Sequence, residues 1–189
     1  MVQAPTCVTG AAPDVRPTTE ADRSDIARIH REAFSQDEEA DLALALLDDP
    51  SAAPRISLLA AIDGMAVGHV LSSHALIAQN DGEGIAASLI APLGIVGHAQ
   101  RRGCGGQLVV SAVNAAKAAG AQFVFVFGDP AYYGRLGFKS AVPFRVQPPH
   151  PVGAHEDAFM VHVTSGSALP PAGKLACAQS LDHPALWAA

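Results

Sequence analysis

Residues 96–109 read VGHAQRRGCGGQLV and place two arginines directly before three closely spaced glycines. An apolar run, residues 86–96, leads into this stretch, and an alanine-rich run, residues 105–120, follows it. The first run is typical of a strand and the second of a helix that ends at Gly120. The stretch therefore predicts a positively charged turn between a strand and a helix, and we call residues 100–107 the glycine corner.

A helix N-terminus of this kind can bind an anion, because its first backbone N–H groups have no partner within the helix and the helix dipole is positive there. Gly103, Gly105 and Gly106 let the backbone approach a ligand closely. Arg101 and Arg102 add positive charge at the rim. The corner predicts a phosphate or pyrophosphate site, and the alternative is a plain helix start with flexible glycines.

Two other phosphate-binding motifs fit this corner less well. The chain has no G-x-x-x-x-G-K-[ST] sequence, which excludes a Walker P-loop. A dinucleotide-binding fold stays an alternative, because a strand that ends near Asp129 follows the helix. Its glycine fingerprint is incomplete, since Leu108 stands where the third glycine is expected.

Length, composition and cysteine content limit the class of protein. The chain has 189 residues, of which 49% are hydrophobic, and a net charge of -6, which fits one domain and disfavours a nucleic-acid-binding protein. No apolar run is long enough to cross a bilayer, and no signal-peptide pattern is seen. We expect residues 1–13 to form a flexible tail and residues 14–189 the domain. Three distant cysteines, Cys7, Cys104 and Cys177, favour a reduced cytoplasmic compartment, and we expect no metal and no nucleic-acid or membrane partner.

The remaining patterns predict an α/β or α+β fold with one mixed sheet. The pair Asp63-Gly64 is a strong hairpin signal, so the runs around it and the run that follows should form an antiparallel meander. The uncharged run 121–128 should be a buried central strand. In order, we expect a strand and helix cap (14–22), two helices (20–34 and 37–49), the meander (55–62, 64–77 and 86–96), a helix (105–120), a strand (121–128), a short helical turn (129–138), a proline-rich loop (143–154) and a last strand (156–164).

The glycine corner resembles a known family motif. Residues 100–105 fit the Q/R-x-x-G-x-G/A pattern of the GNAT N-acetyltransferases, and residues 133–138 resemble the family's Y-x-x-x-G-F segment. Residues 91–96 are similar to its splayed central strand, and the string GDPAYYGRLGF is similar to the bacterial YhbS-like subgroup. The resemblance covers about residues 14–180, and the tail 176–189 matches nothing in it.

The resemblance implies a GNAT-type fold, with a mostly antiparallel central sheet flanked by helices. It implies an acyltransferase that moves an acetyl group from acetyl-CoA to an amine by direct attack, and it leaves a homodimer open. The strand before the corner would pair with the pantetheine arm, and the corner would hold the pyrophosphate. The implied cofactor-binding residues are Leu93, Gly94, Ile95, Val96, Arg101, Arg102, Gly103, Cys104, Gly105, Gly106 and Gln107.

Tyr133 stands at the family's general-acid position, and Tyr132 is expected to pack. An ordinary tyrosine pKa of about 10 exceeds that of a thiol, about 8.5, so full proton transfer to the leaving thiolate is somewhat uphill. A strong hydrogen bond from the Tyr133 hydroxyl to the thiolate is therefore its expected role. The alternative is an ordinary core tyrosine.

The amine must lose a proton, and the base stays open at the level of the sequence. Glu39 stands where the subgroup carries an acid and is the first candidate, although a helix N-terminus also favours glutamate. His69 and His74 have a suitable intrinsic pKa, and Asp129 ends a strand beside Tyr133. Each also has a structural explanation, such as a helix cap for Asp129.

An alternative function follows from the missing base: a non-catalytic acyl-CoA-binding sensor on the same fold. An NAD(P)-binding protein is a weaker alternative. Loops 34–55 and 143–156 should determine which acceptor binds. Four acidic residues suit a cationic amine, or equally a solvated helix face: Asp37, Glu38, Glu39 and Asp41.

Overall fold

The helices and strands of the protein are seen in a computed structural model that describes residues 12–79, 84–164 and 170–188. The strands are β1 (Asp14–Pro17), β2 (Ile56–Ile62), β3 (Met65–Ala78), β4 (Ile85–Ile95), β5 (Phe123–Phe127), β6 (Lys139–Ser140), β7 (Val146–Gln147), β8 (Phe159–Val163) and β9 (Gly173–Cys177). The α-helices are α1 (Arg23–Phe34), α2 (Glu38–Asp48), α3 (Cys104–Ala118) and α4 (Pro130–Tyr133). Residues 1–11 of the expected tail, and residues 80–83 between β3 and β4, lie outside the described residues.

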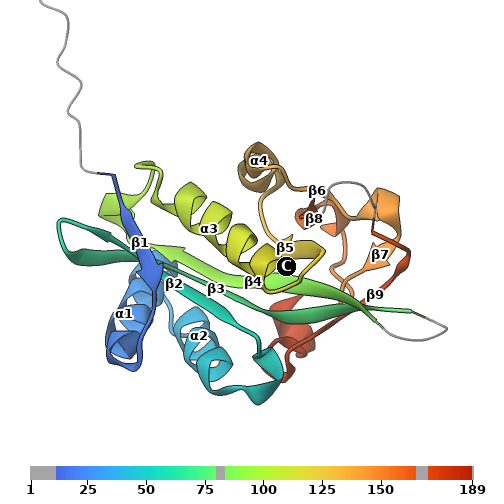
Figure 1. The fold of residues 1–189 in the computed structure, drawn as a ribbon, viewed down its shortest axis with the longest axis horizontal. Coiled ribbons are helices and arrows are strands. Elements are labelled where there is room, and N and C mark those ends of the chain that lie inside the picture. Colours follow the sequence, from blue (N-terminus) through green and yellow to red (C-terminus); the bar gives the residue numbers. More distant parts are fainter. Residues whose placement is uncertain (1–11, 80–83, 165–169, 189) are drawn as a thin grey trace, which may run out of the picture.

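These strands form one sheet in the order β1-β2-β3-β4-β5-β8-β6, with β9 beside β3 and β7 beside β9 (Figure 1). The meander β2-β3-β4 is antiparallel, and the parallel pairs in the described chain are β4-β5 and β7-β9. Asp63 and Gly64 form the first hairpin turn with φ of 51° and 77°. The expected mixed, mostly antiparallel sheet flanked by helices is confirmed.

Helices cover both faces of the sheet, with α1 and α2 on one face and α3 on the other (Figure 1). Successive residues of a strand point to opposite faces, so β4 and β5 contribute to both cores. Leu89 and Phe125 pack in a cluster with Leu46 of α2. Ile90 packs with Leu108 of α3 in the other. Within the described residues, no helix has both the length and the apolar character to cross a membrane.

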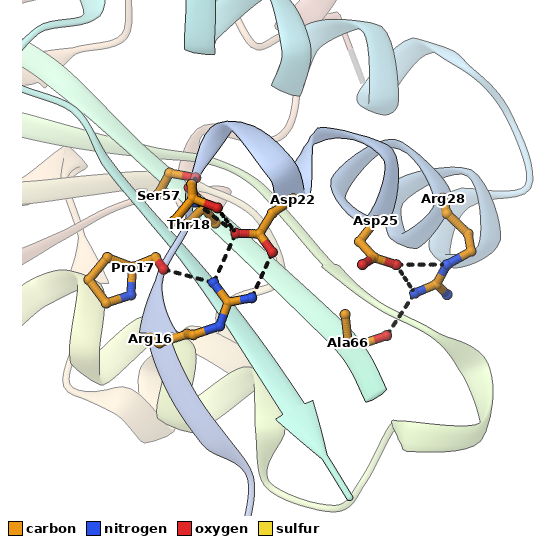
Figure 2. Close-up of polar contacts among 9 residues, drawn as sticks. Arg16, Pro17, Thr18, Asp22, Asp25, Arg28, Ser57 and Ala66 are labelled. Carbon is orange, nitrogen blue, oxygen red and sulfur yellow. Dashed lines mark hydrogen bonds and ion pairs between the residues drawn. The ribbon is translucent and has the colours of Figure 1, made fainter. Parts of the chain in front are cut away.

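Polar contacts fasten α1 to the sheet beneath it (Figure 2). Arg16 of β1 donates two hydrogen bonds to the Asp22 carboxylate, at 2.9 and 2.6 Å, just before α1 begins. Six residues after Asp22, Arg28 donates to the backbone carbonyl of Ala66 in β3 at 2.8 Å. The residues of α1 that face the sheet are therefore held against β3 and β4.

β4 and β5 separate before β4 ends. Their pairing extends from Ala87 to Ile90 of β4, whereas β4 stays paired with β3 as far as Ile95. The register with β3 shifts at residues 91–92, as expected for a bulge that bends a strand away from its neighbour. Residues 93–95 thus have a partner strand on one side in the described sheet, and we call their other side the open edge of β4.

The expectation that 156–164 is the last strand is wrong. β9 follows it and pairs with β3, and Leu175, Leu181 and Trp187 are buried. The carboxylate of Asp49 holds this C-terminal segment, because it accepts hydrogen bonds from the backbone N–H and the hydroxyl of Ser180 at 2.9 and 2.8 Å. The sequence GKLAC of β9 has weak strand propensity, so its pairing with β3 decides its conformation.

Candidate active site

The glycine corner forms the N-terminus of α3. Gly103 is the N-cap residue with φ of 85°, a left-handed conformation that favours glycine, and Cys104 begins the helix. Within the described residues no side chain caps this helix, so the N–H groups of its first turn are left for a ligand. Arg101 and Arg102 are exposed beside it. The Cys104 side chain is buried, so a ligand at the corner would contact its backbone and not its thiol.

The open edge of β4 begins directly before this corner. The N–H of Val96 donates to Val67 of β3 at 3.0 Å, so the backbone of Val96 faces β3. The direction of the backbone N–H and C=O groups alternates along a strand. Those of Gly94 therefore also point to β3, and those of Leu93 and Ile95 point to the open side. The Gln100 side chain donates to the Ile95 carbonyl at 3.2 Å, which agrees with this alternation. The backbone groups on the open side are therefore those of Leu93 and Ile95.

A cavity of about 390 Å³ lies where β4 and β5 separate, and we call it the β4–β5 cavity. Elements distant in the sequence line it: the end of α1, the start of α2, both strands, α4 and the C-terminal segment. Its lining includes the hydrophobic residues Phe34, Leu42, Pro92, Leu93, Phe127, Leu186 and Trp187 and the polar residues Glu38, Glu39, Asp129 and Tyr133. Among the described residues of the lining, none is Lys, Arg or His. In the described chain, no three His, Cys, Asp or Glu side chains are grouped to hold a metal.

Tyr133 lies at the inner wall of this cavity with only 8% of its surface exposed. Its ring packs edge-on against Tyr132 and Phe138, at centroid distances of 4.9 and 5.5 Å. Gly128 makes room for it, because a Cβ there would lie 2.6 Å from the ring. Burial raises the pKa of Tyr133 well above 10, and its side chain lines the cavity. Tyr133 therefore stays protonated and can donate a hydrogen bond into the cavity.

Tyr132 of α4 contacts the glycine corner. Nothing in the sequence indicated this contact. Its hydroxyl lies so close to Gly105 that a Cβ on Gly105 would collide with it. The guanidinium of Arg135 lies 5.8 Å from the centre of the Tyr132 ring. The motif GDPAYYGRLGF contains two adjacent tyrosines, and only the folded arrangement shows that one faces the cavity and the other the corner.

The candidate bases fall into two groups. Glu39 and Asp129 line the cavity, whereas His69 and His74 do not. The Glu39 carboxylate accepts hydrogen bonds from the Gln36 amide at 3.2 and 3.0 Å. Asp129 caps α4, because its carboxylate accepts the Ala131 N–H at 2.8 Å. Glu39 is half-buried and, in contrast to Asp129, does not cap a helix.

His69 belongs to a buried pair of histidines. Its Nδ1 lies 2.8 Å from Nε2 of His30 in α1, and its Nε2 lies 2.8 Å from the hydroxyl of Ser57. Both rings are fully buried, and Nδ1 of His30 faces Gly94 of β4 with no partner among the described residues. Burial lowers the pKa of His30 to about 4 and lowers that of His69 as well. In the sequence His30 lies four residues from both Ile26 and Phe34, which is the spacing of one face of a helix.

We expect the protein to lose stability as pH falls from about 6.5 towards 4. In this range the unfolded chain binds protons at His30 and His69, whereas the folded chain excludes them, so acid favours unfolding. The shift of His30 corresponds to a loss on the order of 3 kcal/mol in the free energy of unfolding. Asp22, whose pKa is lowered chiefly by the hydrogen bond from Arg16, contributes only below about pH 4.

Urea unfolding at several pH values tests this expectation. His69→Gln should be less stable than the parent at pH 7.5 and should show a flatter pH dependence. The exposed His98→Gln serves as the control and should follow the parent. A parent whose stability is constant between pH 6.5 and 4.5 would contradict a pair of histidines buried in the neutral form.

Comparison with known proteins points to one family. No protein-family model matches the chain. A curated protein of Escherichia coli (strain K12), the uncharacterized N-acetyltransferase YjhQ, is 33% identical over 171 residues, which cover 89% of this chain and 94% of YjhQ.

Solved structures agree with that relative. The GNAT family N-acetyltransferase YhbS from Escherichia coli, solved in complex with CoA, is 26% identical with a TM-score of 0.80, and the match covers 90% of this chain and 92% of that one. A GNAT family acetyltransferase from Brucella melitensis, in complex with acetyl-CoA, has the same fold at 23% identity and a TM-score of 0.70. That match covers 90% of this chain and 99% of the Brucella chain.

Proposed function

This chain belongs to the GNAT family of N-acetyltransferases, and on that premise we propose that it binds acetyl-CoA along the open edge of β4 and an amine in the β4–β5 cavity. Its activity is the transfer of the acetyl group from acetyl-CoA to the amine. One observation carries the proposal: the open edge of β4 leads directly into the uncapped N-terminus of α3, and Leu93 of this edge also lines the cavity that contains Tyr133.

Each part of the cofactor has a suitable partner on this path. The pyrophosphate would accept hydrogen bonds from the first-turn N–H groups of α3, with Arg101 and Arg102 adding charge. The pantetheine amides would pair with the backbone of Leu93 and Ile95 as an added strand. The CoA complex of YhbS supports this use of the fold. The thioester would then reach the cavity next to Tyr133.

The residues of the cavity account for the reaction steps. We assign proton removal from the ammonium to Glu39, since a protonated amine has no lone pair for attack. The neutral nitrogen attacks the thioester carbonyl, a C–N bond forms, and the C–S bond breaks. The leaving thiolate accepts a hydrogen bond from the Tyr133 hydroxyl, and an N–H of the open edge of β4 stabilises the carbonyl oxygen. The second proton of the nitrogen leaves to solvent.

Binding and turnover test the proposal separately. Titration calorimetry should show acetyl-CoA binding, and thiol release should depend on an added amine. Absence of binding at about 500 μM acetyl-CoA by a folded protein would contradict the cofactor assignment, because such enzymes work at micromolar to millimolar substrate. Binding without thiol release across a broad amine panel would favour the sensor alternative.

We also propose that the enzyme acts in the cytoplasm. Two free thiols support this, the buried Cys104 and the half-buried Cys177, since a reducing compartment keeps thiols unpaired. Subcellular fractionation tests the location. The homodimer stays a prediction, which sedimentation analysis tests.

A further inference from the structure

Part of the lining of the β4–β5 cavity is hydrophobic and closely packed, and it includes Phe127, Leu181 and Trp187. Trp187 stacks on Phe127 at a centroid distance of 5.8 Å and packs edge-on against Phe159 at 6.1 Å. Its indole N–H donates to the Leu181 carbonyl at 2.9 Å. Because the N–H is already bonded within the protein, the Trp187 ring can offer a ligand only its apolar surface.

Two more apolar side chains stand at the mouth of the same cavity. Phe34 and Leu186 each keep 39% of their surface exposed and are among the large hydrophobic residues that face solvent. Phe34 comes from the end of α1 and Leu186 from the C-terminal segment, so the fold brings them to one opening. Exposed hydrophobic residues at a cavity mouth are typical of sites for apolar ligands.

The lining of the cavity also contains acidic side chains. Glu38 and Glu39 stand at the start of α2, and Asp129 stands before α4. Glu38 makes no hydrogen bond or ion pair with any residue that the structure describes. Because the described lining contains acidic side chains and no positive one, the cavity favours an ammonium group and repels a carboxylate or phosphate.

Tyr133 lines the same cavity and is buried except for 8% of its surface. In the proposed function its hydroxyl faces the thioester sulfur, so the acceptor amine lies next to it. The cavity volume of about 390 Å³ lies within the range of small-molecule sites.

We propose that the acceptor is a small primary amine that carries an aromatic or branched hydrocarbon group. The hydrocarbon lies against Trp187 and Phe34, and the ammonium faces Glu38 and Glu39. This assignment rests on the proposed acetyl transfer and names its acceptor class. A lysine side chain of a protein is the competing acceptor, and the experiment includes it.

Trp187 provides a readout that does not depend on catalysis. It is the single tryptophan of the chain, so its fluorescence reports on the cavity. Phenethylamine should change this fluorescence in a saturable way. Three probes each change one feature of phenethylamine. Phenethyl alcohol lacks the positive charge, 3-phenylpropionate carries a negative charge in its place, and ethanolamine lacks the aromatic hydrocarbon. We expect each to bind about tenfold more weakly or worse, as is typical when one group of a ligand loses its partner.

Thiol release with acetyl-CoA should rank the same amines in the same order by kcat/KM. Phenethylamine should exceed both ethanolamine and a peptide that contains lysine. Phe34→Ala should weaken phenethylamine binding and leave ethanolamine unchanged, while Glu38→Gln should weaken phenethylamine and leave phenethyl alcohol unchanged. Met65→Ala, at another exposed hydrophobic residue outside the cavity lining, is the matched control for Phe34 and should behave as the parent.

The outcomes separate this inference from the proposed function. If acetyl-CoA binds and the peptide lysine or ethanolamine is the best acceptor, the acceptor class is wrong and acetyl transfer stands. If phenethylamine leaves the Trp187 fluorescence unchanged up to about 10 mM, above the millimolar limit typical of substrates, the acceptor class is also overturned. If phenethylamine binds as expected and no amine releases thiol, the site assignment stands and acetyl transfer fails.

Discussion

A Gly105→Val variant should lose most of its affinity for acetyl-CoA while the protein stays folded. Gly105 lies in the first turn of α3, where N–H groups must approach the pyrophosphate, and a β-branched side chain there would keep the phosphates away. Several charged hydrogen bonds, each worth about 1.5 to 3 kcal/mol, depend on this approach, so we expect the Kd to rise about a hundredfold. Calorimetry with acetyl-CoA measures the effect.

Arg102→Ala should be milder, with a Kd raised at most about tenfold, because exposed charges are screened by solvent. Gly106→Ala is a control for Gly105, since a Cβ at Gly106 meets only Leu136 at an ordinary 3.5 Å. A stronger effect of Arg102→Ala than of Gly105→Val would mean that the arginines bind the phosphates and the glycines only form the turn.

The contact between Gly105 and Tyr132 calls for a second control. A side chain at Gly105 would displace the Tyr132 hydroxyl, so weak binding could come from this collision as well as from lost approach to the phosphates. The double variant Gly105→Val/Tyr132→Phe removes the colliding oxygen. We expect its affinity to stay low. Recovery of binding in the double variant would assign the loss to Tyr132 and would contradict the phosphate explanation.

Tyr133→Phe should lower kcat by about a hundredfold and leave the affinity for acetyl-CoA almost unchanged. The hydroxyl acts on the thiolate that forms as the C–S bond breaks, so it matters in the transition state more than in the ground state. Burial raises its pKa, which favours a hydrogen-bond donor that remains protonated. The variant keeps the ring that packs against Tyr132 and Phe138, so the measurement isolates the hydroxyl.

Tyr132→Phe is the matched control for this experiment, since it removes a hydroxyl from the adjacent residue. We expect kcat close to that of the parent, with any change confined to acetyl-CoA binding, because the Tyr132 hydroxyl lies at Gly105. Steady-state kinetics of thiol release measures both variants. If Tyr132→Phe is the slow variant and Tyr133→Phe is normal, the roles of the two tyrosines are exchanged. If neither is slow, the family's general-acid position has no such role in this chain.

The sequence by itself determined the elements whose signals are local. The turn Asp63-Gly64 and the two left-handed glycines Gly103 and Gly120 stand where their backbone conformation is needed. The patterns of apolar residues along the chain predicted the meander, α3 and β5. Such a pattern depends only on which face of an element is buried. For the same reason the glycine corner could be recognised from a few adjacent residues, since the proposed anion site lies at a single helix N-terminus.

The tertiary structure alone decided which residues line the β4–β5 cavity. The β4–β5 cavity joins Phe34, Phe127 and Trp187, which are far apart in the sequence, and nothing local in any of them indicates the others. β9 shows the same limit, since five residues of weak propensity become a strand only when β3 offers them a partner. The pair His30–His69 is another case. His30 in α1 and His69 in β3 are 39 residues apart, and they meet only when α1 packs on the sheet. Contacts of this kind depend on long-range packing and register, which a local pattern does not specify.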